Sequence, residues 1–401
     1  MSTADVRADV EQVDVVIAGD GPVGMLLALA LEDARIDHRL IGNDRQAQDR
    51  PIALAYSSRI LLERLGAFRA LESTPIESIH VSQRGGFGRT LIQAKDYRLP
   101  ALGYVVSYSN VCSALRQRLA AAAVIAQVSR YSPTTQGDGV LIEATDGANT
   151  HRMRARLLVI AEGSPLSGRL VRSGAAVSRR AEDAFEQRRD YGQSAVVATV
   201  ESEHPHRHRA WERFTAHGPL GLLPFGERLA MVWSTTHESA HGLCSLSDAA
   251  FLARLRETFG GRLGRFVSAG PRSTFPLALR YRRGSPAPHV ITVGNAAQTL
   301  HPVAGQGLNL GFRDAWELAA ALERGDPGSI GATEFIRAYL TERSLDRAGG
   351  IGITDALVRV FSNDNPALAA SRGLALAALD IVSPARHFLA RRMMFGARAL
   401  P

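Results

Sequence analysis

The sequence predicts an α/β fold in which a Rossmann-like domain carries an inserted β-rich domain and is followed by helices. Three observations support this prediction. A G-x-G-x-x-G stretch lies between a strand-like and a helix-like segment near the N-terminus, a second glycine-rich stretch precedes a helix near residue 300, and residues 191–235 alternate in the manner of strands. Since 401 residues exceed one ordinary core, more than one domain is expected.

Composition restricts the classes of partner. The net charge is +8, and the arginines are spread along the chain, which favours anionic lipid or phosphorylated ligands. Nucleic acid is not expected, because zinc-finger spacing, basic heptads and aromatic RNA-binding signatures are absent. Cys112 and Cys244 are too few and too distant for a disulfide framework, so a reducing cytoplasm is expected. No apolar stretch approaches the ~20 residues that span a bilayer.

The N-terminal glycine loop lies within "VDVVIAGDGPVGMLLALA". Val13–Ala18 is expected to be a buried strand, residues 25–31 a buried helix and residues 36–41 a second strand. Gly19 permits the tight turn, Gly21 lets a pyrophosphate approach the backbone, and Gly24 lets helix and strand pack closely. The strand–loop–helix context makes this a dinucleotide-binding loop rather than a turn without a ligand.

Two positions depart from the usual pattern of such a loop. Asp20 places a carboxylate beside the phosphates, which is costly unless its side chain points away. The acid that usually follows the second strand and binds a ribose hydroxyl is replaced by Gly42. Asn43 or Asp44 is the predicted substitute. The chain holds a single G-x-G-x-x-G. Any second nucleotide would therefore bind without a βαβ unit of its own.

The second glycine-rich stretch is "GNAAQTLHPVAGQGLNLG", residues 294–311. It follows a short strand, residues 290–293, and leads into a helix expected over residues 308–322. The glycine amides and the helix N-terminus suit negative charge or an electron-rich carbonyl edge. The Asn295 amide can bind sugar-like hydroxyls. His301 precedes Pro302 in a turn, with no nearby carboxylate to orient it, so a structural role is favoured over acid–base catalysis.

A third motif is "ARLLVIAEGSPLSGRL", in which a strand over residues 157–160 precedes Glu162 and Gly163. In this order and spacing the three motifs resemble those of the FAD-dependent aromatic hydroxylases, the class A flavoprotein monooxygenases. The resemblance implies a glutathione-reductase-like FAD-binding domain whose last motif lines the ribityl chain and isoalloxazine. The predicted cofactor-binding residues are Gly19, Gly21, Pro22, Val23, Gly24, Asn43, Asp44, Arg50, Glu162, Gly163, Gly294, Asn295, Pro302, Gly305, Gly307, Leu308 and Asn309.

Several other segments narrow the resemblance to the ubiquinone-biosynthesis branch, especially to the 2-octaprenyl-6-methoxyphenol hydroxylases. They are "GNAAQTLHPVAGQGLNLG", "ERFTAHGPLGLLPF", "HVSQRGGFG", "GITDALVRVF" and "DRPIALA". Arg50, in the last segment, is implied to lie near the FAD pyrophosphate or ribose, where a guanidinium offsets phosphate charge. Glu162 departs from the family's usual aspartate, as Gly42 departs from its usual acid. Both departures leave open an enzyme that binds FAD more weakly or that depends on assembly with partners.

The resemblance divides the chain into alternating parts. The FAD-binding domain takes residues 1–76, 110–175 and 284–330, a substrate domain takes residues 77–109 and 176–283, and helices take residues 331–401. The β-rich substrate domain is expected to place a sheet face above the flavin. Residues that could contact substrate there are Phe214, Leu220, Leu222, Pro224 and His301, although for any single apolar one ordinary core packing is favoured.

The C-terminal segment is both basic and apolar, so residues 383–401 are expected either to rest on anionic lipid or to pack on the FAD-binding domain. The tract "HPHRHR" lacks a spaced partner cluster, so a hairpin loop is favoured over a metal site. No metal is expected.

The resemblance implies that NADPH or NADH reduces FAD and that reduced flavin uses O₂ to hydroxylate a polyprenylated phenol. It implies no catalytic side chain, because the cofactor supplies the reactive group. The expected location is the cytoplasm, peripheral to the inner membrane, with possible partners in a ubiquinone-biosynthesis complex or a homo-oligomer. Two alternatives stay open: a flavin hydroxylase of another aromatic molecule, and a non-catalytic FAD-fold scaffold subunit.

Overall fold

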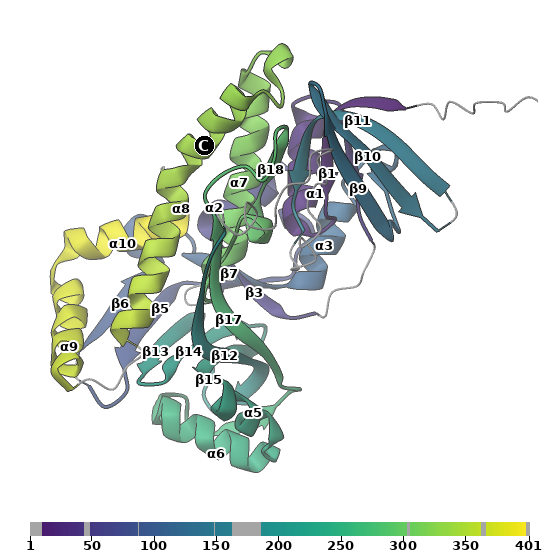
Figure 1. Ribbon diagram of the computed structural model, residues 1–401. Coiled ribbons are helices and arrows are strands. Elements are labelled where there is room, and N and C mark those ends of the chain that lie inside the picture. The colour runs from purple at the N-terminus through teal and green to yellow at the C-terminus, as the bar shows by residue number, and fades with distance from the viewer. Residues whose placement is uncertain are drawn as a thin grey trace, which may run out of the picture.

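A computed structural model describes residues 10–43, 49–86, 88–147, 149–162, 186–302, 305–361 and 366–397. It contains a seven-stranded sheet, a nine-stranded sheet and a three-stranded sheet. The two large sheets lie in separate halves of the molecule, and the long helix α8 (Thr333–Phe361) runs along both (Figure 1). The predicted α/β fold with an inserted β-rich part is confirmed.

The seven-stranded sheet has the order β8-β2-β1-β11-β10-β9, with β18 also paired to β11. Its strands are β1 (Glu11–Ala18), β2 (His38–Ile41), β8 (Val124–Ile125), β9 (Arg130–Gln136), β10 (Gly139–Asp146), β11 (Asn149–Ile160) and β18 (Val290–Thr292). The parallel register places Ala18 beside both Ile41 and Ile160, and Ile160 beside Thr292. The carboxyl ends of four strands therefore meet at one edge, where ligands of such sheets bind.

Four helices share a hydrophobic core with this sheet. They are α1 (Pro22–Asp33), α2 (Tyr56–Arg64), α3 (Tyr108–Arg116) and α7 (Gln306–Arg324). Residues 22–31 of α1 are all buried, because α1 is packed between β1, α3 and α7. One hydrophobic core joins α1 and α7 to the apolar side chains of β1 and β11.

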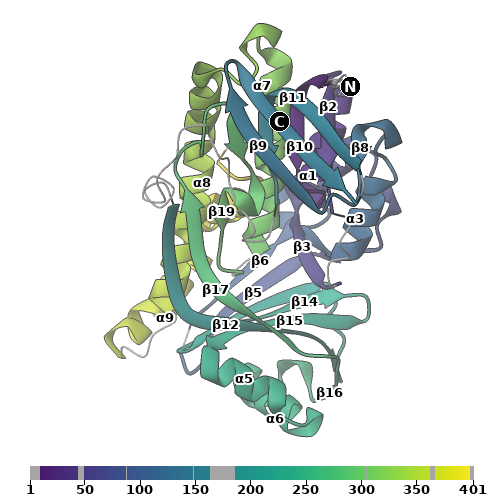
Figure 2. The same cartoon turned by 45° about the vertical axis from the view of Figure 1, so that its right-hand side comes forward.

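The nine-stranded sheet has the order β19-β17-β12-β15-β14-β13-β5-β6, with β16 paired to β12. Its strands are β5 (Ser78–Gln83), β6 (Arg89–Gln93), β12 (Glu186–Ser202), β13 (Arg209–Thr215), β14 (Gly218–Phe225), β15 (Arg228–Thr236), β16 (Phe266–Ala269), β17 (Ser273–Arg282) and β19 (Gln298–Thr299). The helices α5 (His237–Ser245) and α6 (Asp248–Phe259) cover its outer face, on the side away from the seven-stranded sheet (Figure 2).

The inner face of this sheet looks toward the nucleotide-binding half. There Ala210, Ala230 and Leu223 pack with Ile76 and Val105 of the three-stranded sheet. That sheet consists of β3 (Pro51–Ala55), β7 (Gly103–Ser107) and β4 (Ser73–Ile76). Thus β5 and β6 extend the nine-stranded sheet. By contrast, β7, which follows β6 in the chain and precedes α3, belongs to the three-stranded sheet.

The C-terminal part contains α8 and then α9 (Pro366–Ile381) and α10 (Ser383–Phe395). The two last helices bend by 97° at the break between them. Among the described helices none is by itself long and apolar enough to cross a bilayer, although Gly373–Ile381 and Ser383–Phe395 satisfy that test as one bent pair.

A buried ionic network attaches α8 to α7. The Asp314 carboxylate lies 2.9 Å from Nε of Arg343 and 3.2 Å from Nη2 of Arg347, and it accepts a 2.6 Å hydrogen bond from Gln298. Burial raises the pKa of Asp314, but the two guanidinium groups outweigh that effect and hold the pKa below its usual value. Arg347 also donates to the Thr292 carbonyl at the end of β18. The network thus positions the start of the second glycine-rich stretch.

We expect Asp314→Ala to lower the free energy of unfolding by about 3–5 kcal/mol, because two buried arginines lose their shared counter-charge. Asp138→Ala is the matched control: Asp138 pairs with Arg154 at the surface, and such pairs contribute about 0–1 kcal/mol. Urea unfolding of both variants measures the difference. Equal losses would show that the network does not stabilise the fold.

Candidate functional site

The N-terminal glycine loop is packed as tightly as its pattern predicts. A Cβ at position 24 would lie 1.9 Å from the Gly19 carbonyl oxygen, and one at position 19 would lie 2.9 Å from the Glu162 backbone nitrogen. Gly19 also has a φ of 122°, which side chains rarely adopt. At Gly21 the nearest atom to a Cβ would be the Tyr108 hydroxyl, 3.8 Å away. Only Gly21 therefore leaves room for a ligand to approach the loop.

Two helices begin close to this edge without a side-chain cap among the described residues. Gly21 is the N-cap of α1, and Gly305, with a φ of 59°, is the N-cap of α7. The first turns of both helices contain no acidic residue. The amides of such helix ends attract negative charge. The arrangement suits an anionic ligand that reaches from one helix to the other.

Val23 joins the two glycine motifs. Its methyl carbons lie 3.2 Å from where a Cβ of Gly294 would stand, and one lies 2.8 Å from the corresponding position at Gly311. A side chain at either glycine would push α1 away from α7. The structure thus brings together two motifs that are far apart in the sequence, as their joint assignment to one cofactor requires.

The Asn309 side chain bonds to protein groups, whereas its motif suggested that it contacts the cofactor. Its Oδ1 accepts hydrogen bonds from the Ala55 amide and the Ser58 hydroxyl, each 2.7 Å long. Its Nδ2 donates to the Ala53 and Gly305 carbonyls, at 3.0 and 2.7 Å. All polar capacity of the buried amide is used, so the side chain positions the start of α7 against β3 and α2 instead of contacting a ligand.

The remaining residues of the second motif surround an open region. Asn295 is exposed on the short helix η6 (Gly294–Ala296), and Pro302 and Leu308 are half-buried. A Cβ at Gly307 would meet nothing within 4 Å. This open side of the α7 N-terminus is the place that the sequence predicted for the flavin end of the cofactor.

Arg50 and Glu162 flank the first loop. The Arg50 guanidinium stacks 4.5 Å from the ring centre of Tyr108, whose hydroxyl faces Gly21. Glu162 lies two residues beyond the end of β11. Its carboxylate accepts a hydrogen bond from Tyr131, and burial raises its pKa. Asn43 is exposed just beyond β2. Asp44 and Gly163 lie outside the described residues.

These features fit FAD. The glycine loop can hold the pyrophosphate at the start of α1, and Arg50 can supply positive charge beside it. The α7 N-terminus and Asn295 can contact the ribityl and ring end. The sheet that would face the ring forms the second half of the site.

Only some of the apolar residues predicted to contact substrate lie on the inner face of the nine-stranded sheet. Phe214 is buried on the inner face, on the same side of β13 as Ala210. Leu220 and Leu222 instead belong to the core beneath α5 and α6, and the alternation of β14 puts Pro224 on that outer side as well. Their assignment to substrate was wrong. Because strand side chains alternate, the inner positions of β14 are Pro219, Gly221, Leu223 and Phe225.

His301 is fully buried, and its Nε2 lies 3.3 Å from Oε1 of Gln193 on the inner face of β12. Its ring also meets Tyr191 edge-on, with centres 5.4 Å apart. Burial lowers the pKa of His301 to about 4, which favours the neutral ring at pH 7. A positioning role beside the inner face agrees with this geometry.

Glu212 is an inner-face residue that sequence reasoning missed. It lies between Ala210 and Phe214 on β13, and its carboxylate is 3.5 Å from where a Cβ of Gly221 would stand. Burial raises its pKa to about 7. A carboxyl with this pKa can accept or donate a proton near neutral pH. The available signal was strand alternation, which puts Glu212 and Phe214 on one face.

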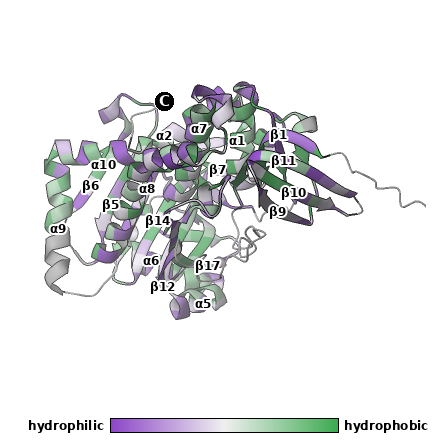
Figure 3. Ribbon diagram, turned by 45° about the horizontal axis from the view of Figure 1, so that its top comes forward, coloured by the Kyte–Doolittle hydropathy of each residue, from purple (hydrophilic) through white to green (hydrophobic). Residues whose placement is uncertain are grey.

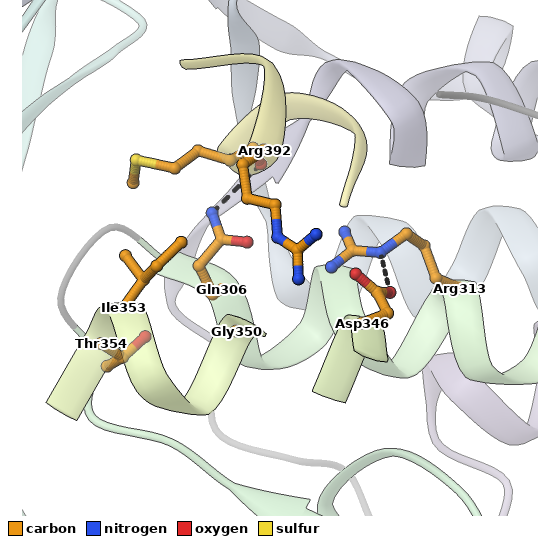
Figure 4. Close-up of a pocket in the computed structure, with 8 residues that line it drawn as sticks. Gln306, Arg313, Asp346, Gly350, Ile353, Thr354 and Arg392 are labelled. Atoms are coloured by element: carbon orange, nitrogen blue, oxygen red, sulfur yellow. Dashed lines mark hydrogen bonds and ion pairs between the residues drawn. The ribbon is translucent and has the colours of Figure 1, made fainter. Parts of the chain in front are cut away.

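A small cavity lies where α7, α8 and α10 meet, close to the second motif (Figure 4). Its volume is about 20 Å³, and Gln306, Arg313, Asp346 and Arg392 contribute polar groups to its wall. It has room for about one water molecule and is too small for an aromatic substrate. It belongs to the packing of the C-terminal helices.

The fold and the two glycine motifs define a dinucleotide-binding protein of the flavoprotein class. The model of the FAD binding domain family matches residues 12–346. The chain belongs to this family and is an FAD-dependent monooxygenase, as predicted.

Curated relatives align over nearly the whole chain. Ubiquinone hydroxylase UbiL of Rhodospirillum rubrum is 34% identical and covers 98% of this chain and 92% of its own length. The human ubiquinone biosynthesis monooxygenase COQ6 is 28% identical, covering 93% and 91%. The 3-demethoxyubiquinol 3-hydroxylase of Escherichia coli is 28% identical, covering 92% and 94%.

Solved structures share the fold. The p-nitrophenol 4-monooxygenase PnpA of Pseudomonas putida superposes with a TM-score of 0.72 at 17% identity, covering 97% of this chain and 100% of its own. A variant of HpxO from Klebsiella pneumoniae, complexed with FAD, gives 0.71 at 16% identity, covering 94% and 99%.

We expect Gly24→Ala to reduce bound FAD at least about tenfold and to destabilise the fold by about 1–3 kcal/mol, since the new methyl group collides with backbone. Gly242→Ala is the control, because a Cβ there meets nothing within 4 Å. Flavin absorbance per protein after FAD addition measures the first effect. Full flavin occupancy in Gly24→Ala would contradict the assigned loop.

Proposed function

We propose that this enzyme hydroxylates the aromatic ring of a polyprenylated phenol in ubiquinone biosynthesis, with FAD as cofactor, NADPH or NADH as reductant and O₂ as oxidant. The observation that carries the proposal is end-to-end similarity to relatives named as ubiquinone hydroxylases. These names favour a catalytic role over a scaffold role. They also favour a ubiquinone precursor over another aromatic substrate.

FAD, when bound, supplies the activation of O₂. The protein's own residues would bind and orient the cofactor: the glycine loop and Arg50 would hold the pyrophosphate, and the α7 N-terminus would favour negative charge at the carbonyl edge of the flavin. Phe214 provides apolar surface on the inner face and helps to exclude water. Glu212 is placed to accept a hydrogen bond from a phenol hydroxyl. The catalytic demands on side chains are therefore small.

Deletion of the gene followed by quinone profiling tests this function. We expect ubiquinone to be lost and a prenylated phenol lacking one specific hydroxyl to accumulate. Expression of the wild-type chain should restore ubiquinone, whereas Gly24→Ala should not. Normal ubiquinone in the deletion strain would overturn the proposal.

We also propose that the enzyme works on the surface of an anionic membrane, from the cytoplasmic side, where a polyprenyl substrate would reside. The supporting feature is an apolar corner, which we define as Leu374, Ile381, Val382 and Phe388, exposed by 62, 82, 48 and 70%. They lie on α9, on α10 and, for Val382, at the break between these helices, at the end of the molecule opposite β1 and β11 (Figure 3). The exposed cation Arg391 on α10 adds attraction to anionic lipid.

The face of α10 that packs on the protein is equally clear. Ala390 and Met394 are buried against Ile92 and Leu102, and Phe395 meets Tyr56 edge-on. The sequence left open whether this helix packs on the protein or rests on lipid. Its inward side packs, and the apolar corner is the part we assign to lipid.

Flotation of the full chain with phosphatidylglycerol-containing liposomes tests this surface. We expect Ile381→Ser combined with Phe388→Ser to reduce the bound fraction at least about fivefold, because apolar burial drives the insertion. Val267→Ser is the matched control, since Val267 is 54% exposed on β16. Unchanged flotation would remove lipid as the partner and favour a protein of a biosynthetic complex.

A further inference from the structure

The end of β2 lacks the acid that usually binds the adenosine ribose in dinucleotide folds. Gly42 occupies that place, immediately after Ile41. Its backbone is held on both sides, since its amide donates to the Ile125 carbonyl and its carbonyl accepts from the Val128 amide. Its φ lies outside the left-handed region, so backbone conformation does not require glycine here.

The requirement for glycine comes from Asp20. A Cβ at position 42 would lie 2.3 Å from both Cβ and Cγ of Asp20 and 2.5 Å from its Oδ2. No side chain at position 42 can share this space. The Asp20 side chain therefore crosses from the glycine loop to the end of β2, and its carboxylate stands over the position of the missing acid.

The charge of this carboxylate is balanced. Nη2 of Arg116, on α3, lies 3.2 Å from Oδ2 of Asp20. The Asp20 side chain is mostly shielded, with 17% exposed, whereas the Arg116 side chain is 43% exposed. A nearby cation offsets the repulsion between Asp20 and the pyrophosphate. This balance explains how an acid is tolerated inside a phosphate-binding loop.

We propose that Asp20 replaces the acid that is missing at position 42, so that the Asp20 carboxylate accepts hydrogen bonds from the adenosine ribose hydroxyls of FAD. This assignment replaces the expected Asn43 or Asp44. It rests on FAD binding and is independent of which phenol is hydroxylated. A carboxylate oxygen is the acceptor that a ribose diol requires, and Asp20 delivers it from the first loop instead of from β2.

The test is the dissociation constant for FAD, measured on apoprotein by quenching of flavin fluorescence. We expect Asp20→Asn to weaken FAD binding at least tenfold. Gly42→Glu alone should also lose binding, because the new side chain collides with Asp20. The combined variant Asp20→Gly with Gly42→Glu should recover affinity to within threefold of wild type, since it returns the acid to β2. Glycine is needed at position 20 because the Asp20 Cβ itself occupies the space.

Two controls separate this role from a structural one. Arg116→Ala removes the balancing cation and keeps the carboxylate, so FAD affinity should fall by less than in Asp20→Asn; a loss equal to that of Asp20→Asn would make Asp20 only a partner of Arg116. Asn43→Ala should keep FAD affinity within threefold of wild type. A tenfold loss there, with none in Asp20→Asn, would assign the ribose to Asn43.

Wild-type affinity in Asp20→Asn, or no recovery in the combined variant despite native circular dichroism, would overturn the proposal. Quinone profiling decides the hydroxylation step separately.

Discussion

The site depends on the close contact of two helices with the carboxyl ends of β1, β11 and β18. Gly19 and Gly24 let α1 meet the strand ends, and Gly294 and Gly311 let α7 approach Val23. A methyl group at any of these positions would meet atoms of the neighbouring element. Close packing therefore directs the N-termini of α1 and α7 toward one edge, where their amides can act on the same anionic cofactor.

In the function proposed above, the second half of the molecule supplies a face for the substrate. The nine-stranded sheet is covered by α5 and α6 on one side, so its other side is free to face the nucleotide-binding half. α8 connects the halves: Asp346 pairs with Arg313 of α7, and Asp355 accepts from Tyr191 of β12. Buried charges between Arg343 and Arg347 hold the middle of α8 to α7, and the hydrogen bond of Asp355 ties its later turns to the nine-stranded sheet.

Most of the architecture could be predicted from the sequence because its signals are local. In three places a few neighbouring residues determine the local conformation. These are the G-x-G-x-x-G, the apolar helix after it and the second glycine-rich stretch. The errors concern which side of an element faces which neighbour. Leu220 and Leu222 are apolar on a predicted strand, but only the positions of α5 and α6 reveal that their face is the outer one. The bonds of Asn309 to Ala53 and Ala55, and the place of Asp20 over Gly42, likewise depend on contacts between distant segments.

We infer that the two glycine motifs form one FAD site. The most direct measurement is the visible absorbance spectrum of purified full-length protein after addition of FAD and removal of the excess. The structure predicts a flavin spectrum with one equivalent of FAD bound per chain. A protein that stays colourless while its circular dichroism shows a native fold would contradict the account.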